Sequence, residues 1–260
     1  MQNKTALITG ASSGIGYELA KILAKNCDVL VLVSRRQERL LEVKKELENS
    51  SRVFVKIIVK DLSQPGAVDD IYRELESEKI SVDILINNAG VGHLGSFTET
   101  DWRHDTDMIA TNIMALTHMT KLFVKDMIVR KNGKIINVAS TAAFQPGPFM
   151  AVYYASKAYV LSFSEAIANE LQGTGVTVTA LCPGPTATDF AKVAEMERSR
   201  LFSIKPPASA AAVARYGYDA MMKGKTVAVH GVVNKIIAFS VRLSPRKLVP
   251  LISRRLHEKN

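Results

Sequence analysis

Residues 4–16 read Lys-Thr-Ala-Leu-Ile-Thr-Gly-Ala-Ser-Ser-Gly-Ile-Gly, a short apolar stretch that runs directly into a glycine-rich turn. A helical segment follows from about Tyr17 to Lys25. Glycines let the backbone turn sharply and approach a pyrophosphate, and the following helix offers free N–H groups and the positive end of its dipole. A tight loop without a ligand is the alternative, but the strand-to-helix context favours nucleotide binding. The residues expected at the phosphates are Gly10, Ser12, Ser13, Gly14, Ile15 and Gly16.

The same alternation of apolar strand and longer amphipathic segment continues to about residue 230, which predicts an α/β fold. Further strands are expected at 29–33, 53–59, 82–86, 134–138 and 176–181. The chain has 260 residues, 47% of them hydrophobic, and no linker or repeat interrupts it, so we expect one domain over residues 1–230. The first strand starts almost at the initiator Met and leaves no room for a signal peptide, which predicts a cytoplasmic protein. Cys27 and Cys182 lack metal-like spacing, so we expect free thiols and no metal.

Residues 231–260 form a basic, amphipathic C-terminal extension. Nine basic residues and one acidic residue lie between Lys223 and Asn260, which places +8 of the total net charge of +9 there. Apolar residues are interleaved with them, a pattern that fits a packed arm with a solvated basic face, peripheral contact with a membrane surface, or nucleic acid. Of these three we expect nucleic acid least. No uncharged stretch approaches the ~20 residues that cross a bilayer.

The second strand ends in Ser34-Arg35-Arg36, where related nucleotide-binding folds choose between NAD and NADP. No carboxylate is present for a ribose 2′-hydroxyl, and guanidinium groups suit a 2′-phosphate. The sequence therefore predicts NADP(H), with Arg35 as the stronger candidate, because Arg36 can also begin a solvated helix.

Polar and glycine residues follow the third and fourth strands. Lys60-Asp61-Leu62 comes after one, and Asn87-Asn88-Ala89-Gly90 after the other. Ligands of open parallel sheets bind beyond the carboxyl ends of the strands. Asp61 could accept from an adenine amino group and Gly90 lets the backbone pass a ribose, although each is also an ordinary turn residue.

Tyr153 and Lys157 stand four residues apart at the start of a segment that runs to Leu171 without Pro or Gly. This spacing puts both side chains on one helical face. A nearby cation stabilises a phenolate, so Lys157 is expected to lower the pKa of Tyr153. Taken alone, the pair is also compatible with coincidence on a long helix.

Together these motifs resemble the short-chain dehydrogenase/reductase family. The resemblance is carried by residues 9–16, by Asn87-Asn88-Ala89-Gly90, by Ser140 and Tyr153-x-x-x-Lys157 in their order and spacing, and by Pro183-Gly184, and it covers residue 4 to about 230. It implies a single doubly wound Rossmann-type domain with a seven-stranded parallel sheet, a nicotinamide cofactor and a homodimer or homotetramer built on the helices around 106–127 and 152–171.

The resemblance also implies the roles of individual residues. Tyr153 is the expected general acid/base, Ser140 the donor to the substrate oxygen, and Lys157 the ligand of the nicotinamide ribose. Tyr154 and Tyr159 are weaker alternatives, since only Tyr153 has both the family's Ser interval and the Lys. Asn112 enters through the resemblance alone, as the anchor of a water that relays protons to Lys157. The expected cofactor contacts besides the glycine turn are Arg35, Arg36, Asp61, Leu62, Asn88, Ala89, Gly90, Tyr153, Lys157, Pro183, Gly184, Thr186 and Thr188.

The sequence predicts reduction or oxidation of a carbonyl or alcohol and points to an apolar substrate. Three segments are expected to line its pocket, 91–97, 141–150 and 189–207. A cofactor-binding protein without turnover, whose tail serves a partner or membrane, is the alternative function. Ordinary loop packing would explain the same apolar residues, which are Leu94, Phe97, Phe144, Phe149, Met150, Phe190, Met196, Leu201 and Phe202.

Overall fold

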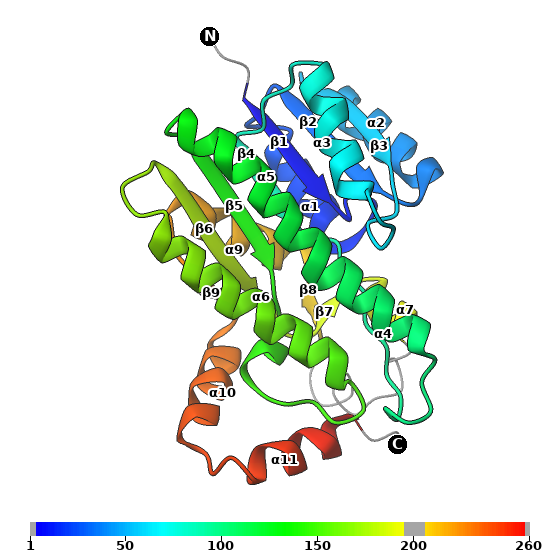
Figure 1. Ribbon diagram of the computed structural model, residues 1–260, viewed down its shortest axis with the longest axis vertical. Coiled ribbons are helices and arrows are strands. Elements are labelled where there is room, and N and C mark those ends of the chain that lie inside the picture. Colours follow the sequence, from blue (N-terminus) through cyan, green and yellow to red (C-terminus); the bar gives the residue numbers. More distant parts are fainter. Residues whose placement is uncertain (1–3, 195–205, 258–260) are drawn as a thin grey trace.

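The computed structural model describes residues 4–194 and 206–257, which are built around one parallel sheet (Figure 1). Its seven strands pair in the order β3-β2-β1-β4-β5-β6-β9. The order reverses between β1 and β4, and such a reversal opens a crevice beyond the strand ends. In sheet order the strands are β3 (Phe54–Val59), β2 (Val29–Ser34), β1 (Thr5–Thr9), β4 (Ile84–Asn87), β5 (Gly133–Val138), β6 (Val176–Cys182) and β9 (Val227–Val229).

Helices cover both faces of the sheet, so the central strands are apolar on both sides. Alternate residues of one strand enter different cores: Ala6 and Ile8 pack on one face, and Leu7 on the other. The first face is covered by α1 (Gly14–Leu23), α2 (Gln37–Ser50) and α9 (Ala210–Met222). The second is covered by α3 (Ala67–Ser77), α5 (Leu116–Val129) and α6 (Ala151–Glu170).

The predicted fold class is confirmed. The predicted strands shift by at most two residues at either end, and the helix that carries Tyr153 begins at Ala151, before the tyrosine. The seventh strand, β9, was not located individually from the sequence, because its three residues give too short a pattern to recognise.

Shorter elements surround the carboxyl ends of the strands. A continuous helical segment runs through α4 (Trp102–Met108) and a π-helical turn η1 (Ile109–Ala115) into α5. The others are the 3₁₀ turn η2 (Thr141–Phe144), the strands β7 (Thr186–Ala187) and β8 (Ala208–Ser209) of a small second sheet, and α7 (Phe190–Val193). Three residues predicted to line the pocket, Met196, Leu201 and Phe202, lie outside the described residues.

The chain after β9 folds as two helices, α10 (Val232–Leu243) and α11 (Leu248–His257). They lie together at one end of the molecule, below α6 in Figure 1, and α10 packs against η2. Within 4–194 and 206–257, no helix is both long and apolar enough to cross a membrane.

Candidate active site

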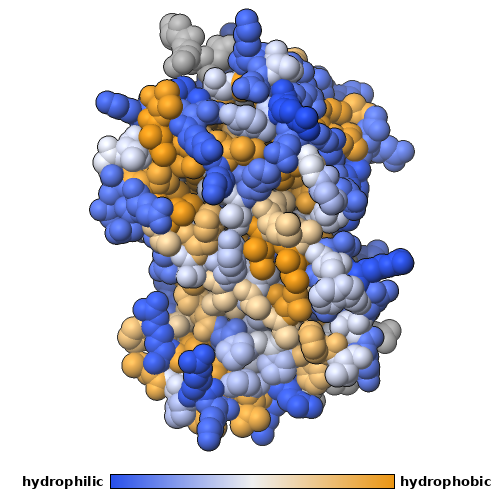
Figure 2. Space-filling view, in the orientation of Figure 1, coloured by the Kyte–Doolittle hydropathy of each residue, from blue (hydrophilic) through white to orange (hydrophobic). Residues whose placement is uncertain are grey.

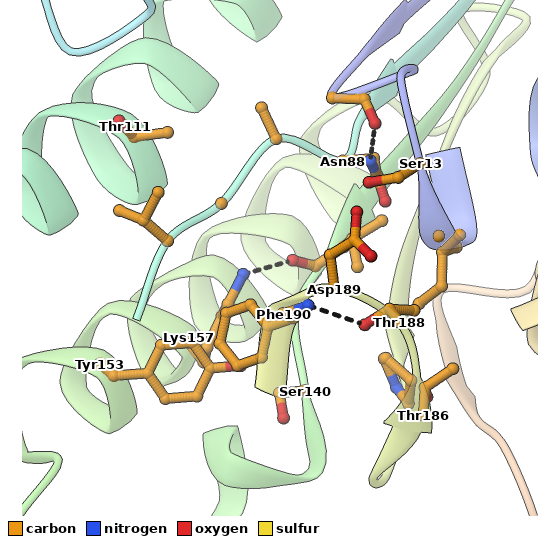
Figure 3. Close-up of a pocket in the computed structure, with 18 of the residues that line it drawn as sticks. Ser13, Asn88, Thr111, Ser140, Tyr153, Lys157, Thr186, Thr188, Asp189 and Phe190 are labelled. Atoms are coloured by element: carbon orange, nitrogen blue, oxygen red, sulfur yellow. Dashed lines mark hydrogen bonds between the residues drawn. The ribbon is translucent and has the colours of Figure 1, made fainter. Parts of the chain in front are cut away.

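A cavity of about 410 Å³ opens at the carboxyl ends of the strands and brings most of the predicted site residues together (Figure 3). Only two of them, Gly16 and Asn112, do not line it. The predicted residues on its wall are Gly10, Ser12, Ser13, Gly14, Ile15, Arg35, Arg36, Asp61, Leu62, Asn88, Ala89, Gly90, Ser140, Tyr153, Lys157, Pro183, Gly184, Thr186 and Thr188. Residues from the segments that follow six strands, and from the helix α6, thus converge on one space.

The glycine-rich turn has the conformation that only glycine adopts without strain. Gly10 has φ +64°, and a Cβ there would lie 2.8 Å from Nδ2 of Asn88. Gly16 lies beneath the turn, where a Cβ would come within 2.4 Å of the Gly10 carbonyl oxygen. The turn therefore packs directly on the start of α1. Because its glycines have no side chains, a phosphate can approach their backbone from the cavity side.

Thr9 is a site residue for which the sequence predicted no role. Its buried hydroxyl oxygen accepts hydrogen bonds from the backbone N–H groups of Asn88 and Ala89, both at 3.0 Å. In return Nδ2 of Asn88 donates to the carbonyl oxygens of Thr9 and Gly10, at 3.0 and 3.1 Å. The end of β4 is thereby locked to the glycine turn, and the Asn88 amide positions the turn from beside the cavity. The only signal in the sequence is a hydroxyl residue at the last position before Gly10.

The two arginines after β2 take different partners. Arg36 Nη2 donates to the hydroxyls of Ser12 and Ser13, at 3.1 and 2.8 Å, and its guanidinium pairs with Asp189 at 3.4 Å. Arg35 points to the other side and lies 3.8 Å from the carboxylate of Asp61. Both guanidinium groups are half-exposed at the rim of the cavity, where they face the end of β2 at which an adenosine ribose would lie.

Tyr153 and Lys157 lie on the cavity side of α6, as their spacing predicts, and Ser140 faces them from the loop after β5 (Figure 3). Ser140 caps η2, and its Oγ accepts from the Ala142 N–H at 3.1 Å. Lys157 Nζ donates to the Val138 carbonyl oxygen at 2.9 Å and lies 5.7 Å from the centroid of the Tyr153 ring. Of the alternative tyrosines, Tyr159 turns away to a hydrogen bond with Thr117 at 3.0 Å.

Burial is the main cause of the pKa shifts of Tyr153 and Lys157, and one expectation about these pKa values is wrong. The sequence predicted that Lys157 lowers the pKa of Tyr153, but burial raises that pKa to about 12, and the Ser140 side chain opposes the rise by hydrogen bonding. Burial also lowers the pKa of Lys157 to about 8. The physical reason is that both groups lie in an apolar surrounding that penalises the charged form of each, and Lys157 reaches past the ring to the Val138 carbonyl.

Asn112 sits in the π-helical turn, fully buried behind the cavity wall. Its Oδ1 accepts from the Val91 N–H and its Nδ2 donates to the Val91 carbonyl, both at 2.9 Å, with a further bond to Ser156 Oγ at 3.0 Å. A Cβ on Gly90 would lie 3.2 Å from Lys157 Nζ and 3.3 Å from Asn112 Oδ1. Asn112 thus holds the segment at residue 91 and, through it, places Gly90 beside Lys157.

The turn after β6 closes the far wall. Thr141 N–H donates to the Pro183 carbonyl at 2.8 Å, which ties this turn to the Ser140 loop. Thr186 Oγ1 donates to the Gly184 carbonyl at 2.9 Å, and Thr188 Oγ1 accepts from the Phe190 N–H at 3.3 Å. At its end Thr188 lies directly against the glycine turn, where a Cβ on Gly14 would come 2.9 Å from its Cγ2.

The end of the cavity beyond Tyr153 is apolar, but only part of the predicted set lines it. Met150 and Phe190 do, and the rings of Phe190 and Tyr153 lie 5.4 Å apart. Leu94 and Phe149 pack in the cluster behind them. Two expectations are wrong: Phe97 is exposed to solvent, and Phe144 packs against another part of the core. Their apolarity was visible in the sequence, whereas the direction of a loop side chain was not.

The fold and this site together define a nucleotide-binding oxidoreductase of the doubly wound α/β class. The family model for short chain dehydrogenases matches residues 4–199, and the chain belongs to that family.

Similar proteins support this assignment. The chain is 36% identical over 191 residues to 2-dehydro-3-deoxy-D-gluconate 5-dehydrogenase of Bacillus subtilis (72% of this chain, 73% of the relative). It is 39% identical over 194 residues to a very-long-chain 3-oxoacyl-CoA reductase of Pyrenophora tritici-repentis (72% and 56%). A short-chain dehydrogenase from Sphingobium yanoikuyae, solved in complex with NADPH, superposes with a TM-score of 0.82 at 28% identity (92% and 94%). The chain is therefore an oxidoreductase that acts on alcohol or carbonyl groups.

Proposed function

We propose that this protein is an NADP(H)-dependent oxidoreductase in which Tyr153 exchanges a proton with the oxygen of a lipophilic ketone or secondary alcohol. The observation that carries the proposal is the convergence of Ser140, Tyr153 and Lys157 at the apolar end of the cavity whose other end is the glycine turn. The nicotinamide, when bound, supplies or accepts the hydride. The cavity wall runs from Gly10 of the glycine turn to Tyr153, as the wall of a dinucleotide site does.

Each side chain of the group has a separate task. In reduction, Tyr153 gives its hydroxyl proton to the carbonyl oxygen, and its high pKa keeps that proton in place until charge develops there. Ser140 stabilises the same oxygen by a hydrogen bond. Lys157, held by the Val138 carbonyl, is a cation at neutral pH and reaches the ribose side of the cavity. Asn112 acts as a positioning residue.

A change at Tyr153 tests the chemistry. Tyr153→Phe is expected to lower kcat by at least about 100-fold while the Kd for NADPH changes less than threefold. Tyr159→Phe is the matched control, because the same hydroxyl is removed from the same helix outside the cavity. Turnover is followed by nicotinamide absorbance with a panel of ketones, and binding by nicotinamide fluorescence. Near-normal turnover of Tyr153→Phe would rule out this role.

The preference for NADP(H) is supported by the pair of arginines at the rim. Their guanidinium groups lie beside Ser12, Ser13 and Asp61. The 28%-identical structure is described with NADPH, which agrees with this preference. Arg35→Asp and Arg36→Ser are each expected to lower the ratio of NADP to NAD affinity by about tenfold, and the control Arg39→Ser, on the outer side of α2, is expected to leave it unchanged.

An apolar substrate is supported by Met150, Tyr154 and Phe190 on the wall. The relatives include enzymes named for a sugar acid and for a very-long-chain 3-oxoacyl-CoA. The apolar wall favours a chain-bearing ketone over a polar sugar acid. Comparing kcat/KM for ketones of increasing chain length with that for a hydroxylated ketone tests this class: equal values would contradict it.

A protein that binds NADP without turnover is the second candidate. The geometry favours the enzyme, because a protein that only binds the cofactor has no use for Ser140 and Tyr153 at the apolar end of the cavity. We also propose a homodimer or homotetramer built on the continuous helix of η1 and α5 together with α6, where Met114 of η1 and Val129 of α5 expose apolar surface, and a peripheral location at a membrane surface through α10 and α11. Analytical ultracentrifugation tests the first of these two.

A further inference from the structure

The outer side of α10 and α11 is an exposed surface on which apolar and basic residues alternate. On α10, Val232, Ile236, Phe239 and Leu243 lie at helical spacing and are between 62% and 75% exposed. The opposite side of the same helix carries Ala238, its one buried residue. The apolar stripe of α10 therefore faces solvent, whereas the apolar side of an ordinary surface helix faces the core.

α11 and the turn before it extend this surface. Leu248, Leu251 and Ile252 are about half-exposed or more, whereas Val249 and Ser253 are buried against the body. The exposed basic residues of the two helices and their turn are Lys235, Arg242, Arg246, Lys247, Arg254 and Arg255. Hydrophobic and hydrophilic residues are accordingly interspersed over the lower end of the molecule (Figure 2).

The charge of this surface selects among the partners that could cover it. Residues 220–257 contain no Asp or Glu. Two copies of the chain meeting here would bring five cations from each side together, those other than Arg254, which turns inward to Phe149. No Asp or Glu of residues 220–257 would lie between them, which disfavours a self-association surface. Nucleic acid would neutralise the cations but leave Ile236, Phe239 and Leu243 against water and phosphate. An interface of anionic headgroups and acyl chains satisfies both kinds of residue.

We infer that α10 and α11 dock on an anionic lipid bilayer, with the Val232–Ile236–Phe239–Leu243 stripe entering the acyl boundary and the surrounding cations meeting the headgroups. The inference rests on the peripheral location in the proposed function and names its partner. Helices of 12 and 10 residues are too short to span the bilayer, so they lie in its surface.

The inner side of the two helices connects this surface to the substrate end of the cavity. α10 packs against η2, and the Arg254 guanidinium lies 5.1 Å from the centroid of the Phe149 ring. Phe149 and Met150 belong to the apolar cluster around Tyr153 and Phe190. A docked protein thus holds the apolar end of its cavity close to the layer from which a lipophilic ketone comes.

Vesicle sedimentation of the full chain tests the inference. The wild type is expected to bind vesicles of equal parts phosphatidylcholine and phosphatidylglycerol at least about tenfold more tightly than phosphatidylcholine vesicles, and to be released as salt rises. Ile236→Ser/Phe239→Ser and Arg246→Gln/Lys247→Gln are each expected to lose about tenfold in affinity. Leu41→Ser/Phe54→Ser, which removes two exposed apolar residues elsewhere, is the matched control.

A second variant makes the result independent of any loss of folding. Leu243→Trp keeps an apolar side chain, and its fluorescence is expected to shift to the blue with anionic vesicles and to be quenched by brominated lipid. Equal binding to both vesicle types, no binding, or an equal loss in the control would overturn the inference. A lower sedimenting mass of the stripe variant without vesicles would also overturn it, in favour of a second copy. Turnover of a water-soluble ketone, measured in parallel, separates this failure from failure of the proposed chemistry.

Discussion

The hydroxyl of Thr9 offers a sharp test of how the glycine turn is held. Thr9→Val keeps the shape of the side chain but removes the oxygen that accepts two backbone N–H groups, those of Asn88 and Ala89. The Ala89 N–H is left without a partner, whereas the Asn88 N–H keeps a bond to the Ile86 carbonyl at 3.1 Å, so we expect a loss of about 1–3 kcal/mol in the free energy of unfolding. With an m-value of roughly 3 kcal/mol/M for urea, the midpoint of unfolding falls by about 0.3–1 M.

Urea unfolding followed by circular dichroism measures this loss, and two variants control it. Thr5→Val makes the same change at the other end of β1, also at a buried position, where the hydroxyl makes no hydrogen bond within the described residues. Thr9→Ser keeps the hydroxyl and is expected to retain most of the stability. NADPH affinity is expected to fall by about tenfold in Thr9→Val, because the turn loses its lock to β4. A loss in Thr9→Val no larger than in Thr5→Val would refute the reasoning.

Three further changes test the catalytic end and the rim. Gly90→Ala places a Cβ 3.2 Å from Lys157 Nζ and 3.3 Å from Asn112 Oδ1, so we expect kcat/KM for NADPH to fall about 10- to 100-fold, measured by steady-state kinetics. The pKa of Lys157 falls from 10.5 to about 8 on folding, so between these values the unfolded chain binds more protons and the free energy of unfolding rises with pH. Relative to Lys157→Met, we expect the wild type to gain about 2 kcal/mol between pH 7.5 and 9.5. A difference in urea midpoints that does not change with pH would contradict this. Asp189→Asn removes the carboxylate 3.4 Å from Arg36; because both side chains are half-exposed, we expect only about a threefold gain in NADP affinity, measured by fluorescence titration, and a loss of affinity would contradict it.

The sheet and the glycine turn were predictable because their signals are local. Leu30, Val31 and Leu32 are consecutive, apolar and all buried, as a strand covered on both faces requires. The Tyr153 and Lys157 pair was predictable in position for the same reason, since four residues of helix fix their shared face. Its titration was not, because the pKa depends on burial by loops distant in the sequence, and spacing along one helix does not report that.

Long-range polar contacts account for the rest. The partners of the Thr9 hydroxyl lie 79 and 80 residues farther along the chain, and Asp189 lies 153 residues from Arg36. Asn112 entered only through the family resemblance, because a buried Asn in a helix has no periodic signature. Its hydrogen bonds to Val91 become visible only once the turn after β4 is placed beside η1.

The turn after β4 joins the two ends of the site into one unit. Asn88, at its start, holds the glycine turn by hydrogen bonds from its Nδ2 to the carbonyl oxygens of Thr9 and Gly10. Gly90, two residues later, occupies the gap beside Lys157. An extended chain advances only about 3.3 Å per residue, so Asn88 and Gly90 are too close for the chain between them to take up a movement. A shift of the glycine turn is therefore passed on to the residues around Lys157. Changes at Thr9 should therefore alter turnover as well as cofactor affinity, and changes at Gly90 should alter cofactor affinity as well as turnover.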